Sequence, residues 1–344
     1  MEKNLNFNRT VVAMAALVIV FAGIKLAAEI VVPFLLALFI AIICSPVIKA
    51  MTQRKVPHGI AIALLFILIV FFFLAGLINS SVQEFTRSIP QYKVLLSERI
   101  NDVIALAQKL KLPIVISREA IMEHFDPSVI MNFVSRLLLN FSGVVTNVFV
   151  LILAVIFMLL EAPTMKHKLA LVLSDNEHDV VAEEHHIDRI LDGVISYLGV
   201  KTVISLLTGV TTWFLLDVAG VQYAILWATL SFLLNYIPNI GSIIAAVPII
   251  VQALLLNGFG VGMGVTAGII ASNIVIGNII EPKMMGKTLG LSTLVVFFSL
   301  LFWGWLLGTV GMLLSVPLTM AFKITLESSE STKKYAALLG DVNE

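Results

Sequence analysis

The polar residues that could bind a ligand are few in this sequence, and most interrupt an uncharged apolar stretch between residues 218 and 280. They are amides, a phenol and helix-breaking prolines and glycines, which supply hydrogen bonds rather than acid–base or nucleophilic chemistry. Neutral donors and acceptors of this kind suit the hydroxyl groups of a small hydrophilic solute. We therefore predict a solute pathway lined by Asn235, Tyr236, Pro238, Asn239, Gly241, Pro248, Asn273 and Asn278.

The segment 235–241 has two interpretations that stay open. A proline frees a backbone carbonyl, and polar backbone inside a membrane is tolerated where protein packs on it or water enters, which favours a broken helix along a pathway. The alternative is a turn at the cytoplasmic boundary, with asparagines that bond to neighbouring helices.

Three charged side chains beside the apolar runs are candidates for an ion or proton relay: Lys25, Glu29 and Glu281. Lys25 and Glu29 stand four residues apart, so on one helix they can pair, which lowers the cost of either charge near a membrane. Glu281 directly precedes a proline at the predicted cytoplasmic end of a span. As an alternative to a relay role, Glu281 simply marks the boundary between this span and the cytoplasm.

The sequence motifs do not support catalysis or ATP hydrolysis. The chain has no H-E-x-x-H motif, and Asp217 is the sole aspartate in or beside the later apolar runs, so no aspartyl dyad can form there. The string Gly286-Lys287-Thr288 resembles the end of a phosphate-binding loop, but Glu281 stands where its first glycine belongs. We predict that the protein is not an enzyme, has no catalytic residue and no cofactor, and uses a gradient rather than ATP.

A metal site and a disulfide framework are disfavoured as well. His185 and His186 are adjacent and point about 100° apart on a helix, whereas ligands converge best from positions i and i+4. We interpret them as part of a solvated polar face and predict no metal. The lone Cys44 excludes an intrachain disulfide and lies in an apolar run, as a buried space-filling residue would.

The elements that must position these residues are membrane helices. Of the 344 residues, 59% are hydrophobic and 13% charged, with a mean hydropathy of +1.02. Soluble domains are about 45–50% apolar. The 22 basic residues balance the 22 acidic ones, so no polybasic field exists to attract nucleic acid. We predict an all-α, polytopic helical membrane protein embedded in the lipid bilayer.

Crossing the hydrocarbon of a bilayer takes about 20 helical residues. The apolar runs predict about eight transmembrane helices, including re-entrant or broken segments. The predicted regions are transmembrane helices 1–3 (1–79), a small extracytoplasmic amphipathic helical insert (80–140), transmembrane helix 4 (141–160), a cytoplasmic amphipathic segment opened by a helix stop at Pro163 (161–196), a C-terminal transmembrane bundle with broken helices (197–325) and a cytoplasmic tail (326–344).

Lysines and arginines cluster at both ends of the chain and in alternate short connections. Because positive loops tend to stay in the cytoplasm, we predict that both termini are cytoplasmic. A short fragment also recurs: Gly241 to Pro248 resembles Gly311 to Pro317, which is one residue shorter. Paired interrupted helices point to binding sites in transporters, and chance similarity is the alternative.

Four stretches resemble the autoinducer-2 exporter family: residues 27–46 (AAEIVVPFLLALFIAIICSP), 235–248 (NYIPNIGSIIAAVP), 280–297 (IEPKMMGKTLGLSTLVVF) and 301–319 (LFWGWLLGTVGMLLSVPLT). The resemblance covers nearly the whole chain. It departs at Cys44-Ser45, where many members carry an asparagine before the proline. It implies a homo-oligomer of the bacterial inner membrane that moves autoinducer-2, a small neutral polyol-like quorum-sensing signal, outward and so lowers its intracellular level.

Two alternatives to this exporter stay open. Other members of the family resemble sodium/proton antiporters, which need a titrating carboxylate inside the membrane; Glu29 and Asp217 keep that function open. The neutral amides of the later spans favour a neutral solute instead. A structural membrane protein without transport activity is the third reading, since a fold does not determine function.

Overall fold

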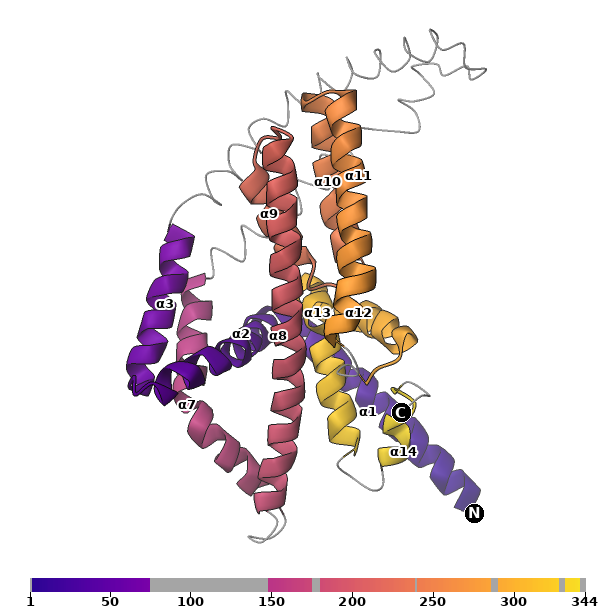
Figure 1. Cartoon of the computed structure of the whole chain (residues 1–344). Helices are drawn as coiled ribbons and strands as arrows, with labels where there is room; N and C mark the ends of the chain where they lie inside the picture. Colours follow the sequence, from indigo (N-terminus) through magenta and orange to yellow (C-terminus); the bar gives the residue numbers. More distant parts are fainter. Residues whose placement is uncertain are drawn as a thin grey trace. The chain divides into compact units, whose positions relative to one another are not determined.

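A computed structural model describes residues 2–74, 148–174, 180–238, 240–285, 290–327 and 332–340, which are helical apart from their connections. The helices lie in the order shown in Figure 1. Their bounds are α1 Glu2–Leu26, α2 Ala28–Gln53, α3 His58–Leu74, α7 Val148–Leu173, α8 Val180–Val218, α9 Ala224–Leu234, α10 Gly241–Leu256, α11 Phe259–Val275, the π-helix η1 Ile276–Ile280, α12 Glu281–Met285, α13 Thr293–Glu327 and α14 Lys333–Ala336.

Five of the described helical stretches are long and apolar enough to cross a membrane: they lie in α2, α7, α8, α11 with its continuation to Met285, and α13. Large apolar side chains are exposed along them, such as Phe214 on α8 and Phe298 on α13. Such surfaces are stable in lipid rather than in water. The prediction of a polytopic helical membrane protein is confirmed. The number of crossings stays a prediction, and the insert 80–140 lies outside the described residues.

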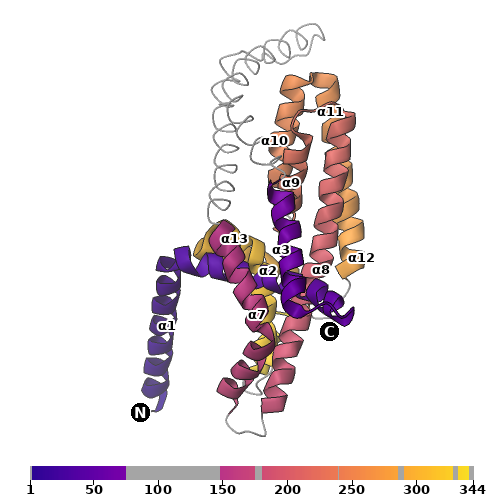
Figure 2. The same cartoon turned by 90° about the vertical axis from the view of Figure 1, so that its left-hand side faces the viewer.

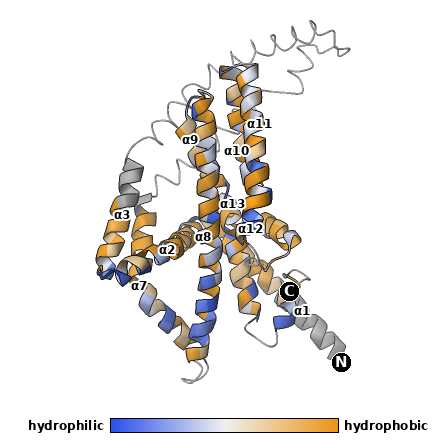
Figure 3. Cartoon of the chain, viewed as in Figure 1, coloured by the Kyte–Doolittle hydropathy of each residue, from blue (hydrophilic) through white to orange (hydrophobic). Residues whose placement is uncertain are grey.

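The chain divides into two compact units. Unit 1 comprises residues 1–65, 149–200 and 285–344, and unit 2 comprises residues 66–148 and 201–284. Helix α8 contributes to both, and its two parts differ in character. Figure 3 shows hydrophilic residues concentrated toward its Val180 end and hydrophobic residues toward its Val218 end.

In unit 1, a turn at Ala27 separates α1 from α2. Lys25 therefore ends one helix and Glu29 begins the next, so the prediction that both sit on one continuous helix is wrong. The Lys25 ammonium instead lies 3.9 Å from the ring centroid of Trp305, in a cation–π contact. Without an unbroken helix between them, the i,i+4 geometry that would pair the two charges is lost.

Helix α7 continues through Pro163 to Leu173, so the predicted helix stop at this proline is wrong. A proline has no N–H, and its position in a helix leaves the carbonyl four residues earlier without a partner. That carbonyl belongs to Leu159, and the His58 ring nitrogen Nε2 lies 3.1 Å from its oxygen. Because a carbonyl can only accept, His58 donates this hydrogen bond. The side chain of α3 thus replaces the bond that Pro163 removes.

This replacement predicts a modest stability effect. His58→Leu should lower the melting temperature of the detergent-solubilised protein by about 3 °C, since a net hydrogen bond contributes about 1 kcal/mol. His185→Leu is the matched control, because the exposed His185 ring bonds to the Val181 carbonyl of its own helix and its loss should change little. In a Pro163→Ala background, where the helix satisfies Leu159 itself, His58→Leu should have no effect. An equal loss in both backgrounds would refute the explanation.

In unit 2, α9 and α10 form a helical hairpin. Trp227 of α9 donates its indole N–H to Gln252 of α10 at 2.7 Å. With 11 residues, α9 is about 16 Å long and too short to cross a bilayer. The arms meet closely at the tip: a Cβ added to Gly241 would lie 1.8 Å from the Leu234 carbonyl oxygen. Figures 1 and 2 show α10 returning beside α11, joined to it by a short loop.

Helix α13 of unit 1 also doubles back, at Gly308, whose φ of 68° is outside the helical region. The indole N–H of Trp303 donates to the Thr319 hydroxyl at 3.0 Å, whereas sixteen residues of straight helix span about 24 Å. A Cβ on Gly311 would lie 2.0 Å from the Trp303 carbonyl oxygen. The recurring fragment therefore has a structural counterpart: both copies begin with a glycine pressed against a carbonyl of the preceding helical arm.

Candidate functional site

The membrane half of α8 buries its polar side chains and exposes its apolar ones. Lys201, Ser205, Thr208 and Thr212 follow one another at steps of three or four residues and are all buried. Large apolar residues on the other faces, such as Val210 and Phe214, are exposed. A helix in water has the opposite arrangement. The polar stripe of α8 thus faces the interior of unit 2.

The tip of the α9–α10 hairpin docks on this stripe. Asn235, buried at the end of α9, donates from its amide nitrogen to the Ser205 hydroxyl at 3.1 Å. The hydroxyls of Tyr236 and Thr202 share a hydrogen bond of 2.8 Å. These contacts pair polar side chains of the tip, and the backbone of the break bonds within itself, with the N–H groups of Ile237 and Gly241 donating to the carbonyls of Leu234 and Ile237.

Helix α11 contributes Asn273, and the π-helix η1 that continues it contributes Asn278. In a regular α-helix, residues five apart, such as these two, point about 140° away from each other. Within η1 the Glu281 N–H donates to the Ile276 carbonyl, five residues earlier, which changes the helical register between Asn273 and Glu281. Asn273, Asn278 and Glu281 line the same cavity.

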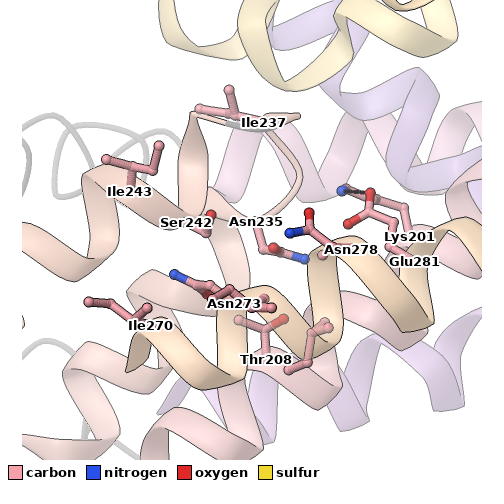
Figure 4. A pocket seen from close by; sticks show the side chains of 13 residues that line it. Lys201, Thr208, Asn235, Ile237, Ser242, Ile243, Ile270, Asn273, Asn278 and Glu281 are labelled. Atoms are coloured by element: carbon pink, nitrogen blue, oxygen red, sulfur yellow. Dashed lines mark hydrogen bonds and ion pairs between the residues drawn. The ribbon is translucent and has the colours of Figure 1, made fainter. Parts of the chain in front are cut away.

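The cavity has a volume of about 260 Å³ and lies within unit 2, among α8, the break between α9 and α10, α10, α11, η1 and the start of α12. Figure 4 shows side chains from all these elements around it. Its volume is slightly below the range of about 300–1,000 Å³ typical of drug-sized ligands, so a smaller solute fits it. Its lining consists of Lys201, Thr208, Asn235, Ile237, Ser242, Ile243, Ile270, Asn273, Ile274, Ile276, Gly277, Asn278 and Glu281.

One ion pair supplies the charges of this lining. The Lys201 ammonium donates to Glu281 at 2.5 Å, with 2% of the lysine side chain and 22% of the glutamate side chain exposed. The pair is drawn at one side of the cavity in Figure 4. Its net charge is zero, and the other polar groups of the lining are three amides and two hydroxyls. The cavity therefore offers donors and acceptors in a neutral environment.

A second, narrower space adjoins the first and shares Thr208, Ser242 and Asn273 with it. Its volume of about 10 Å³ is close to that of a single water molecule. Thr212 and Ser231 add further hydroxyls to its lining. The polar lining thus continues beyond the main cavity.

The structure brings four predicted residues together at the main cavity: Asn235, Asn273, Asn278 and Glu281. Tyr236, Pro238, Gly241 and Pro248 shape the hairpin without lining the cavity, and Asn239 lies outside the described residues. Lys25 and Glu29 belong to unit 1 rather than to this site.

The sequence interpretation missed the apolar lining of the cavity and three of its polar residues: Lys201, Thr208 and Ser242. A signal for the first two was present in the spacing Lys201, Ser205, Thr208 and Thr212, which places one polar face on an otherwise apolar helix. The sequence gives no such signal for Ser242, because this residue reaches the cavity only when the chain folds into the hairpin tip.

Metal ligation has no candidate among the described residues, since no three His, Cys, Asp or Glu side chains converge there. Two histidines of the polar helical segments have other partners. His167 contacts Glu184 at 2.8 Å, and His185 contacts the Val181 carbonyl at 3.0 Å.

Comparisons with known proteins extend over both units. Residues 14–331 match the family described as AI-2E family transporter. A putative transport protein of Haemophilus influenzae is 73% identical, covering 100% of this chain and 99% of the relative. The AI-2 transport protein TqsA of Escherichia coli K12 is 42% identical, covering 99% and 98%. The putative transport protein YhhT of the same strain is 41% identical, covering 95% and 93%.

Proposed function

Because the chain belongs to the AI-2E family of transporters, we propose that it exports autoinducer-2 and so lowers the intracellular level of this quorum-sensing signal. The name of the relative TqsA supports this solute, and the amide-lined cavity of unit 2 supports a small neutral one. The resemblance read from the sequence is confirmed at the level of the family.

The cavity lining is the observation that carries the proposal. Asn235, Asn273 and Asn278 supply both donors and acceptors, and Thr208 and Ser242 supply hydroxyls. A polyhydroxylated solute leaves water only if its own donors and acceptors find partners, because unpaired polar groups are costly to bury. The isoleucines between these groups match the carbon skeleton of such a solute. In this proposal the cavity is the solute-binding site of the pathway.

The remaining features of the proposal follow from sequence pattern and resemblance. The protein resides in the bacterial inner membrane as a homo-oligomer, and both termini face the cytoplasm, in line with the positions of lysines and arginines. Export follows a gradient, since the sequence carries no ATP-binding motif. A transporter working this way needs no catalytic residue and no cofactor.

Reconstitution of the purified protein tests the proposal directly. Proteoliposomes loaded with autoinducer-2 should release it faster than protein-free liposomes, while a pH-sensitive dye inside them stays unchanged when sodium is added. A pH change on addition of sodium, without release of autoinducer-2, would indicate that the protein is a sodium/proton antiporter rather than an exporter of the signal. If neither autoinducer-2 nor protons crossed the membrane, the result would support a structural membrane protein without transport activity.

Two threonines of α8 form a matched pair for the same assay. Thr208 and Thr211 both donate to the carbonyl four residues earlier, but only Thr208 lines the cavity. Thr208→Val should reduce autoinducer-2 release about fivefold, since one solute hydrogen bond of about 1 kcal/mol is lost. Thr211→Val should release the signal at the wild-type rate. If both variants released autoinducer-2 at the same rate, Thr208 would not be part of the pathway.

A further inference from the structure

The ion pair of the cavity joins two side chains that a membrane protein rarely buries. Lys201 is among the largest fully buried side chains of the described residues, and Glu281 is its hydrogen-bonding partner there. The two residues come from different helices, 80 positions apart, and both belong to unit 2. Charges inside a membrane are costly and are kept where they serve a function.

The surroundings of Glu281 resemble those of a cation site. Carboxylate, amide and hydroxyl oxygens are the ligands that hard cations prefer. Asn235, Asn278 and Thr208 border the same cavity as the Glu281 carboxylate, which follows the irregular backbone of η1. Ion-coupled transporters bind sodium at such interruptions of their helices. Here the position beside the carboxylate is held by the Lys201 ammonium.

We propose that Lys201 is a tethered counter-ion, whose ammonium holds the place beside Glu281 that a sodium ion from solution would otherwise take. The pocket then stays neutral throughout transport without binding an ion. Export is accordingly independent of sodium, and Glu281 is not an ion carrier while Lys201 is present. This inference concerns how the carboxylate is neutralised and holds for any neutral solute.

Removal of the ammonium tests this role, because the partly buried Glu281 carboxylate would lose the partner that neutralises it, which is destabilising. In the full-length protein in detergent, Lys201→Met should lower the melting temperature by about 10 °C. Sodium chloride should then raise the melting temperature of this variant by about 5 °C relative to choline chloride at equal ionic strength. The wild-type protein should respond equally to the two salts.

Three further variants separate the counter-ion role from a general loss of packing. Lys201→Met/Glu281→Gln, which removes both charges, should recover most of the lost stability and show no sodium response. Lys201→Arg should remain indifferent to sodium, since it keeps the charge. Lys168→Met is the matched control, because Lys168 and Glu161 also lie 2.5 Å apart but are both exposed, so little stability should be lost.

The proposal is overturned by either of two results. One is a sodium-specific stabilisation of the wild-type protein that Glu281→Gln abolishes, which would show that sodium binds despite Lys201. The other is a Lys201→Met protein that sodium does not stabilise. If that variant cannot be purified, the wild-type and Glu281→Gln titrations still decide the first point. No solute is present in these measurements, so their failure leaves the proposed export of autoinducer-2 standing.

Discussion

Gly241→Ala should abolish export and sharply reduce the amount of folded protein in the membrane. The added methyl group would lie 1.8 Å from the Leu234 carbonyl oxygen and 3.1 Å from Cβ of Ile237. Neither the carbonyl nor the start of α10 can move without opening the hairpin tip that places Asn235 and Ser242. We expect a stability loss of about 3 kcal/mol, the upper end for overpacked sites, measured as the melting temperature in detergent.

Gly260→Ala is the matched control for this variant. Gly260 lies in α11, and an added Cβ would meet nothing within 4 Å. Alanine is favoured over glycine inside a helix by about 1 kcal/mol, so this protein should be as stable as the wild type or more so. If Gly241→Ala behaved like Gly260→Ala, the tight hairpin tip described above would be wrong.

Asn273→Leu/Asn278→Leu should reduce autoinducer-2 release about 100-fold while the protein remains folded. Each leucine keeps the branched arrangement of the asparagine side chain, with two methyl groups in place of the amide oxygen and nitrogen, and it offers no hydrogen bond. Loss of two solute hydrogen bonds of about 1.4 kcal/mol each corresponds to this factor. The release rate from proteoliposomes measures the effect, and the melting temperature measures folding.

The single variants should each lose about tenfold, so that the effects multiply if both amides bind one solute. Unchanged release from the double variant at normal abundance would show that the solute passes elsewhere. Strong unfolding of the double variant would instead indicate that the asparagines stabilise helix packing, which is the alternative interpretation of such residues.

Much of the architecture could be predicted from apolar runs and helix breakers. The long uncharged stretches predicted a helical membrane protein, and the Asn235–Gly241 break predicted an interrupted element at what became a hairpin tip. Asn273 and Asn278 were predicted as partners in one site, although their five-residue spacing places them on different faces of a regular helix. The π-helix that contains Asn278 changes the helical register after Asn273, and hydropathy does not encode such a change.

Two features escaped the sequence interpretation because they depend on contacts between distant residues. Pro163 does not end its helix because His58, about a hundred positions away, takes over the freed Leu159 carbonyl. Lys201 is the single charged residue between positions 193 and 216 of the sequence, and its partner Glu281 lies on another helix. A local pattern can show that a proline or a charge is costly, but only the fold shows which group compensates for it.

Binding of autoinducer-2 to the purified protein tests the central claim, that the amide-lined cavity of unit 2 holds the solute. Isothermal titration of the wild-type protein should give one saturable site, which is lost in Asn273→Leu/Asn278→Leu and kept in Thr211→Val. Equal affinity in the wild type and the double variant would contradict the account, because the solute would then bind outside this cavity.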